Sequence, residues 1–250
     1  MCQNMRTLPG NPTFRNVPLG YMKSKTSILF CLVVALTTVA HAAAAGRGPT
    51  SADAPSDAQV RASMLRVYFH GVDDDLAERV LGPGAIPALR RLLADHDFPR
   101  RDNVVAFLAH LDSGEATRDL IAHLENPNVN VDTPEEDRAL LLTPYALGKI
   151  AARGDRAALD ALLTMTEDRG DGGPLARAAA RGRDPAALRG DLLEAALKGL
   201  AASRSRQARA RLEAISRGSI HPNLPGRDLS RPAAEALVRF EQAGSPGGAA

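Results

Sequence analysis

Six histidines and a few acidic clusters are the residues of this chain that could bind a metal ion or transfer protons. The histidines do not occur in His-Glu-x-x-His or another close ligand spacing. His110 and His123 could be neighbours across a pair of helices, but a single helical histidine is usually a surface or boundary residue. We therefore predict no catalytic residue, no metal site and no cofactor. The histidines are His41, His70, His96, His110, His123 and His221.

The acidic run Asp73-Asp74-Asp75 is the first cluster to suggest a cation site. It lacks the alternating oxygen ligands and the closing glutamate of a calcium loop. Carboxylates directly before Leu76 instead suit the start of a helix, where they cap free amide groups and interact favourably with the helix dipole. We expect a helix start here.

Arg-Gly-Asp occurs three times, at residues 153–155, 169–171 and 189–191. In an exported protein this tripeptide could indicate cell adhesion. A basic helix end, a glycine that stops the helix and an aspartate that caps the next one would produce the same three letters. We therefore expect each copy to be a turn between two helices.

The composition indicates an all-α protein. Aromatic residues make up 4% of the chain and tryptophan is absent, whereas Ala, Leu, Arg and Glu, which favour helices, are abundant. Four of the 31 basic residues and none of the 29 acidic residues precede residue 43, so 27 basic residues face 29 acidic ones after that point. This balance gives no electrostatic reason to expect nucleic acid as a partner.

Residues 133–163 illustrate how the helices are paired. Thr133-Pro134 is typical of a helix start, and apolar residues then recur at steps of three and four up to Ile150. Gly154 is expected to end this helix in the left-handed conformation, and Asp155 to cap the next. The apolar positions are Leu140, Leu141, Ala146, Leu147 and Ile150 in the first helix, and Ala158, Leu159, Leu162 and Leu163 in the second.

The same pattern recurs along the chain. Leu108 and Leu111 precede Leu147 and Ile150 by 39 residues, and Leu197 and Leu200 follow them by 50. A two-helix unit of about 40 residues is the period of HEAT and armadillo arrays. Residues 146–163, with the Gly154-Asp155 turn, resemble a HEAT-like repeat of the phycobilin-lyase type. Residues 84–93 resemble the second helix of such a unit, whereas Ser203-Arg204-Ser205 replaces the expected Gly-Asp.

This resemblance implies a right-handed α-α solenoid of about four HEAT-like helix pairs. It also implies that one helix of every pair lines a concave face that binds protein or peptide. A compact helical bundle is the alternative fold. The alternative function is an enzyme, or an accessory of an enzyme, of the phycobilin-lyase-like branch.

The N-terminal segment is typical of a secretory signal peptide. Lys23 and Lys25 precede the apolar run 28–40, and Ala40 and Ala42 occupy the positions that a signal peptidase reads, with cleavage after Ala42 or alternatively after Ala44. A run of 13 residues is shorter than the roughly 20 needed for a transmembrane helix. We expect an exported protein, periplasmic or extracellular, whose mature chain does not insert stably into a membrane.

The domain organisation follows from these segments. Residues 1–21 are expected to be an upstream extension before Met22, 22–42 the signal peptide, 43–56 a flexible leader, 57–243 the repeat domain and 244–250 a disordered tail.

The leading functional hypothesis is an exported, non-enzymatic scaffold for protein–protein interaction. If the second helix of each pair lines the concave face, its exposed polar residues would contact the partner. These residues are Arg90, Arg91, Arg118, Asp119, His123, Arg156 and Asp160.

Overall fold

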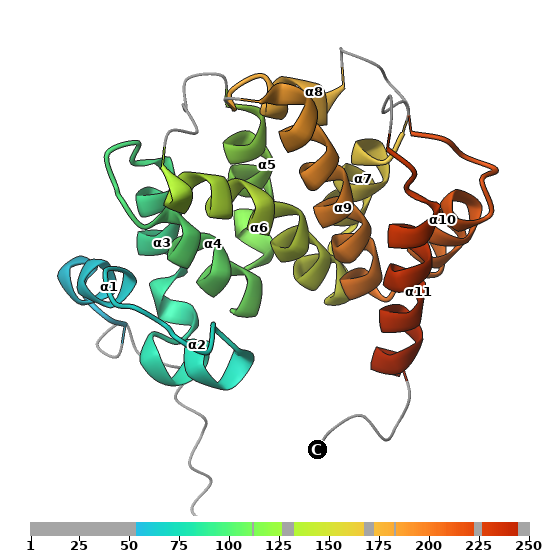
Figure 1. Ribbon diagram of the computed structural model, residues 1–250. Coiled ribbons are helices and arrows are strands. Elements are labelled where there is room, and N and C mark those ends of the chain that lie inside the picture. Colours follow the sequence, from blue (N-terminus) through green and yellow to red (C-terminus); the bar gives the residue numbers. More distant parts are fainter. Residues whose placement is uncertain are drawn as a thin grey trace, which may run out of the picture. The chain divides into compact units, whose positions relative to one another are not determined.

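The computed structural model describes residues 54–111, 113–126, 133–167, 173–182, 184–222 and 227–244. The chain divides into two units, residues 1–46 and 47–250, and all described residues belong to the second. These residues form α-helices, two short 3-10 helices and connecting turns, without a strand among them (Figure 1). The prediction of an all-α protein is confirmed for this part of the chain. The signal peptide with Ala40 and Ala42, most of the leader, and residues 245–250 of the tail lie outside it.

The helices follow one another along the chain in this order: α1 (Asp57–Met64), α2 (Asp74–Val80), η1 (Pro83–Ala85), α3 (Ile86–Ala94), α4 (Arg101–His110), η2 (Gly114–Ala116), α5 (Thr117–Glu125), α6 (Pro134–Ala152), α7 (Arg156–Met165), α8 (Pro174–Ala179), α9 (Pro185–Ser203), α10 (Arg206–Ser216) and α11 (Ser230–Gly244).

Local capping determines where several helices begin. The hydroxyl of Thr133 accepts a hydrogen bond from the Glu136 amide at 3.2 Å, and Asp155 accepts one from Ala158 at 2.9 Å. Asp73 caps α2 in the same way by accepting from Leu76 at 2.7 Å. Each side chain satisfies an amide that has no partner inside the helix. The predicted starts of these three helices are confirmed.

The turn between α9 and α10 ends one helix and caps the next with different residues from those between α6 and α7. Gly154 lies in the turn between α6 and α7 with φ +100°, as predicted, whereas Arg204 occupies the corresponding place between α9 and α10 with φ +53°. Ser205 then caps α10 by accepting from Gln207 at 3.2 Å. An arginine thus adopts the left-handed conformation that glycine normally supplies.

The prediction that Arg189-Gly190-Asp191 forms a turn is wrong, because all three residues lie inside α9. A Cβ on Gly190 would lie 2.9 Å from the guanidinium carbon of Arg227, so the glycine allows that side chain to pack directly on the helix. Residues 169–171 lie outside the described part of the chain. Only the copy at 153–155 is seen to end one helix and begin another.

The helix α6 lies between α4 and α9, and the three form one side of the described unit (Figure 1). Behind them, α5 packs against α6 and α3, α7 packs against α6 and α9, and α10 packs against α9 and α11. The positions equated by the 39- and 50-residue steps all face the core. Leu108, Leu147 and Leu197 are fully buried, and Leu111 and Ile150 are nearly so.

The core consists mainly of leucine and alanine, with Phe98 and Phe107 as its fully buried aromatic side chains. Burying one large aliphatic side chain contributes about 1.5–3 kcal/mol, so the continuous leucine core is the main source of stability. Among the described residues, no helix combines the length and apolar character needed to cross a bilayer.

Candidate functional site

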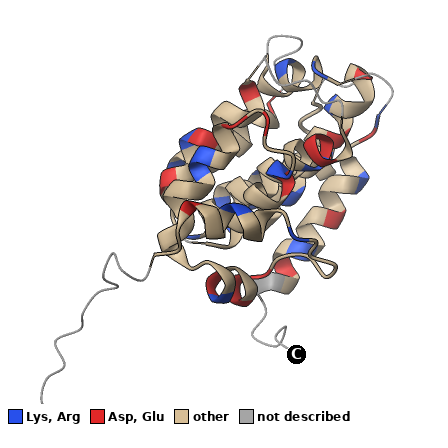
Figure 2. Cartoon of the chain, turned by 90° about the vertical axis from the view of Figure 1, so that its left-hand side faces the viewer, with Lys and Arg blue, Asp and Glu red and all other residues tan. Residues whose placement is uncertain are grey.

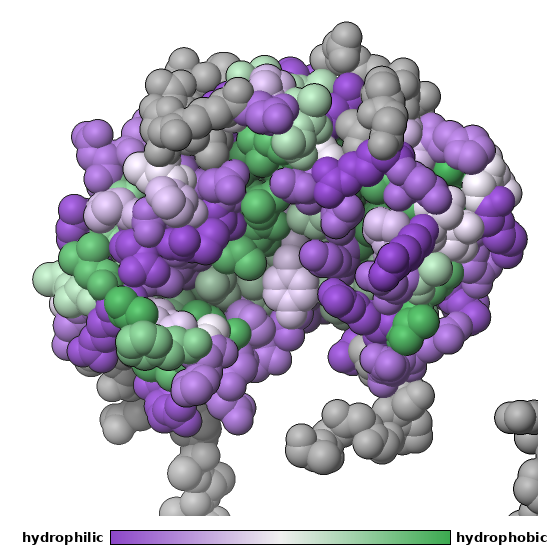
Figure 3. Space-filling model, viewed as in Figure 1, coloured by the Kyte–Doolittle hydropathy of each residue, from purple (hydrophilic) through white to green (hydrophobic). Residues whose placement is uncertain are grey.

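Two adjoining pockets lie on the side formed by α4, α6 and α9, and they share Arg138, Leu142 and Tyr145. Their volumes are about 510 and 620 Å³. Figure 3 shows apolar side chains in the hollow at the middle of this face, between rims of polar residues. We call the two pockets together the central groove.

Helical periodicity places one row of side chains from each helix in the groove. Residues at i, i+3, i+4 and i+7 share a helix face. The row from α6 consists of Arg138, Leu141, Leu142 and Tyr145, and the row from α9 consists of Asp191, Glu194, Ala195 and Lys198. The floor is therefore apolar and the charges stand along its edges.

The other end of the groove is walled by α4 and by the segment 65–72. Val105, Ala106 and Ala109 of α4 line the pocket together with Val67 and Val72. Three side chains of this segment remain exposed although they are apolar: Leu65 (49%), Val67 (62%) and Phe69 (90%). Large exposed apolar residues grouped beside a groove are typical of interaction sites.

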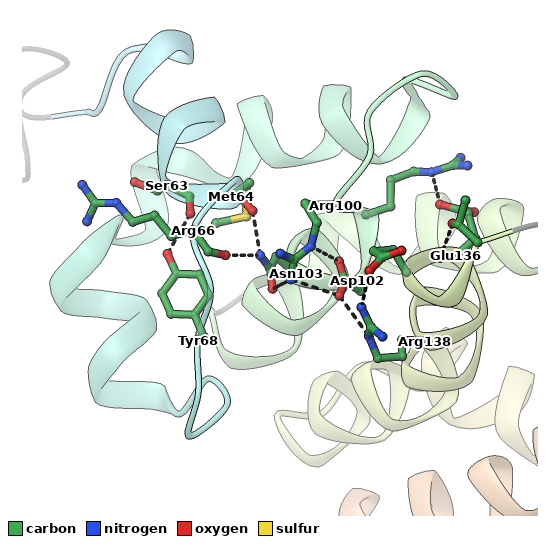
Figure 4. Close-up of polar contacts among 12 residues, drawn as sticks. Ser63, Met64, Arg66, Tyr68, Arg100, Asp102, Asn103, Glu136 and Arg138 are labelled. Atoms are coloured by element: carbon green, nitrogen blue, oxygen red, sulfur yellow. Dashed lines mark hydrogen bonds and ion pairs between the residues drawn. The ribbon is translucent and has the colours of Figure 1, made fainter.

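Asp102 is the centre of the polar edge of this pocket (Figure 4). Its carboxylate is 7% exposed and accepts two hydrogen bonds from Arg100, at 2.9 and 3.2 Å, and one from Arg138 at 3.3 Å. Arg138 also donates to Glu135 at 2.8 Å. These hydrogen bonds satisfy the buried carboxylate oxygens of Asp102 and fix both guanidinium groups at the edge of the groove.

Asn103 holds the segment that forms the wall (Figure 4). Its buried amide nitrogen donates to the carbonyl oxygens of Met64 at 2.6 Å and Arg66 at 2.9 Å. Tyr68 adds a hydrogen bond from its hydroxyl to the Ser63 carbonyl at 2.9 Å. Asn103 supplies a donor to carbonyl groups at and just after the end of α1, where the helix itself offers none, and Tyr68 adds a second donor to the Ser63 carbonyl, which also accepts from the Arg66 amide.

His110 lies at the opposite end of α4 and also lines the groove. Its Nδ1 is 2.8 Å from a carboxylate oxygen of Asp74, and the other oxygen of that carboxylate is 3.2 Å from Lys149. Burial lowers the pKa of His110, and the neighbouring Lys149 and Arg153 act in the same direction, against the hydrogen bond with Asp74. Although burial opposes it, hydrogen bonding to His110 and Lys149 lowers the pKa of Asp74. Histidine and aspartate here connect α2, α4 and α6.

The residues predicted to contact a partner lie on α3, α5 and α7, and none of them lines the central groove. Arg90 forms an ion pair with Asp119, and Arg91 donates to Asp57 at 2.6 Å. Arg91 also borders a smaller hollow of about 310 Å³ between α1 and α3. The remaining exposed residues of the set are Arg118, Arg156 and Asp160.

His123 was expected to be exposed, and that prediction is wrong because only 5% of the residue is exposed. Its Nε2 is buried and has no hydrogen-bond partner among the described residues. Burial, reinforced by the nearby charges of Arg101 and Arg181, lowers the pKa of His123 to about 3. His123 lies near Arg101 at the start of α4, whereas His110 is the last residue of that helix. The two histidines are therefore not brought together.

Sequence reasoning missed the residues that line the groove, above all Tyr145 and Lys198. One signal was present. Tyr145 is one of only three tyrosines, and it directly precedes the buried Ala146 and Leu147, off the apolar face of its helix. An aromatic residue in that position has no core to fill.

Over the described residues, no group of three or more His, Cys, Asp or Glu side chains is placed to bind a metal ion. Basic and acidic side chains are interspersed on the side of the unit seen in Figure 2. Comparisons of the chain with protein families, with curated proteins and with solved structures found no match.

Proposed function

We propose that the mature chain is an exported α-solenoid scaffold that binds a segment of another protein in the central groove. The observation that carries this proposal is the continuity of the groove. Two pockets on adjacent helix pairs share Arg138, Leu142 and Tyr145, so one ligand could contact α4, α6 and α9 together.

The order of helix contacts supports a solenoid rather than a compact bundle. In a solenoid each repeat contacts chiefly its neighbours. Here α6 packs strongly against both α4 and α9, the equivalent helices of the adjacent pairs. A HEAT-like array with a groove on the first helix of each pair accounts for this order.

The chemistry of the groove favours a polypeptide ligand. Its floor contains Leu141, Leu142 and Ala195, while Tyr145 stands 37% exposed at the junction of the two pockets. Interfaces commonly combine such an apolar centre and an aromatic residue with a polar rim. The second helices, which carry Arg118 and Arg156, are the competing location for the same function.

Export is part of the proposal and rests on residues 22–42. A reporter enzyme that folds only outside the cytoplasm, fused after Ala42, should become active, and replacing Leu32 and Val34 with arginine should abolish its activity. Activity that survives the arginine substitutions would contradict export by this segment.

Photocrosslinking from the full exported chain tests the location of the ligand site. Benzoylphenylalanine at position 145 reports on the groove, and at position 118 on the second-helix face. The groove proposal expects an adduct with one discrete protein from position 145. That protein, once purified, should bind the mature chain, and binding should weaken at least tenfold when Leu142 is replaced by Asp.

Two outcomes would contradict the proposal. Adducts from position 118 but not 145 would move the binding surface to the second helices. Equal binding of the purified partner to the wild-type chain and to Leu142→Asp would show that the groove is not the site, provided that circular dichroism shows the variant to be folded.

A further inference from the structure

Nearly all the charged side chains that line the central groove already have partners. Arg100 and Arg138 pair with Asp102, and Arg138 also pairs with Glu135. A ligand that used these groups would have to disrupt an existing ion pair.

The acidic edge of the groove is neutralised in the same way. Arg227 donates to Asp191 and to Glu194, at 2.8 Å in both cases. The pairing is fixed by Gly190, whose missing side chain leaves room for the guanidinium group. These two carboxylates are therefore poor sites for a basic ligand.

Lys198 and Tyr145 differ from the other polar residues of the groove. Lys198 is exposed, and within the described part of the chain its ammonium group has no carboxylate partner. The Tyr145 hydroxyl likewise has no hydrogen bond to a described residue, and burial raises its pKa, so it stays protonated. Both line the pocket of about 620 Å³, with Leu141, Leu142 and Ala195 as its apolar surface.

An ammonium group and a phenolic hydroxyl are both hydrogen-bond donors. A carboxylate is the anion of proteins that can accept from both, and its binding here would break no existing ion pair. The apolar surface beside the two donors suits a leucine, isoleucine or phenylalanine side chain next to the acid.

We infer that the central groove selects a peptide segment in which an acidic side chain binds Lys198 and Tyr145 while an adjacent apolar side chain lies on Leu141, Leu142 and Ala195. This inference rests on the proposed function and specifies its ligand. The groove continues past Tyr145 into the pocket on α4, so the segment passes through the site. The acid is therefore an internal Asp or Glu and not a chain terminus.

Selection from a library of random twelve-residue peptides, displayed with both ends blocked by fusion, tests this without knowledge of the natural partner. The mature wild-type chain should enrich peptides with Asp or Glu next to an apolar residue. Lys198→Glu should lose that enrichment and favour Lys or Arg instead. Arg206→Glu, an exposed substitution on α10 away from the groove, is the matched control and should select the same peptides as the wild type.

A synthetic peptide from the selection, acetylated and amidated, then measures the contribution of the acid. Replacing its Asp or Glu with Asn or Gln should weaken binding about two- to fivefold, the size expected of a partly exposed ion pair. Raising the salt concentration should remove most of that difference.

The outcomes separate this inference from the proposed function. Suppose that the selected peptides lose binding on Leu142→Asp, and so depend on the groove. If they show no enrichment of Asp or Glu, or bind Lys198→Glu as well as the wild type, the inference is overturned and the proposed function stays intact. Binding that requires a free C-terminal carboxylate would overturn it as well. If no selected peptide depends on Leu142, both are contradicted.

Discussion

Gly148 of α6 and Gly199 of α9 lie directly against each other where the two helices pack. A Cβ on Gly148 would lie 2.8 Å from the carbonyl carbon of Gly199, and a Cβ on Gly199 would lie 2.9 Å from that of Pro144. Real Cβ atoms do not approach backbone atoms so closely. The two glycines therefore permit a closer approach of α6 and α9 than any other residue would allow. The floor and edges of the central groove depend on this spacing.

The first prediction concerns that contact. Gly148→Ala and Gly199→Ala should each lower the free energy of unfolding by about 1–3 kcal/mol, because backbone atoms cannot move aside as a side chain can. Thermal denaturation measures the loss as a lower Tm. Gly114→Ala is the control, since its Cβ would meet Asp155 at an ordinary 3.6 Å. Equal Tm values for all three variants would contradict the close packing.

Asn103→Ala should destabilise the protein by about 1–3 kcal/mol, because the carbonyl groups of Met64 and Arg66 lose their donor. The loss should be local as well as global. Hydrogen exchange should accelerate in residues 65–72, which the Asn103 amide holds against α4. The exposed Gln207→Ala should change stability by less than about 0.5 kcal/mol. Unchanged exchange in the 65–72 segment would show that Asn103 does not anchor it.

The turn residues Arg204 and Gly154 both have a positive φ, so introducing glycine at the first and removing it from the second should change the free energy of unfolding in opposite directions. Arg204→Gly should stabilise the protein by about 0.5–1 kcal/mol, because glycine adopts a positive φ without steric cost. Gly154→Ala, at φ +100°, should destabilise it by about 1 kcal/mol or more. Urea titration gives both values. The same sign for both changes would mean that the left-handed conformation does not determine stability at these turns.

The free energy of unfolding should decrease as the pH is lowered below about 6.5, because of His123. Its pKa is about 3 in the folded chain, against the ordinary value of 6.5 that the unfolded chain retains, so between these values the unfolded chain binds the additional proton. Unfolding is therefore favoured as pH falls, at a slope approaching about 1.4 kcal/mol per pH unit for one histidine. The slope levels off below the folded pKa.

Urea titrations between about pH 5 and 7 can isolate this contribution. His123→Leu should reduce the slope by about one proton, and His110, whose pKa is also lowered, supplies a smaller dependence of the same sign in both proteins. Burial raises the pKa of the partly buried Glu136, which acts oppositely, but Glu136 is present in both proteins and cancels in the comparison. An identical slope in the His123→Leu variant would contradict the burial of the neutral ring.

Helix starts and the repeating core could be predicted from the sequence because both depend on residues close together in the chain. Thr133, Asp155 and Asp73 cap helices through amides three residues away. The recurrence of Leu108, Leu147 and Leu197 reflects the periodicity of a buried helix face, and all three are buried. The same local reasoning fails for the Arg-Gly-Asp at 189–191, because the reason for its glycine is Arg227, 37 positions further along the chain.

The candidate site could not be predicted in this way. The sequence-based expectation took the second helix of each pair as the binding face only as a condition, and it placed His123 among the exposed residues. Which helix layer carries the groove depends on how α4, α6 and α9 pack, and on partners such as Asn103 and Met64 that lie 39 residues apart. The sequence by itself determined that the described chain is helical and which faces are apolar, because those properties follow from local hydrogen bonding and periodicity. Only the tertiary structure decided that Tyr145 and Lys198 share a pocket, because contacts between distant helices bring them there.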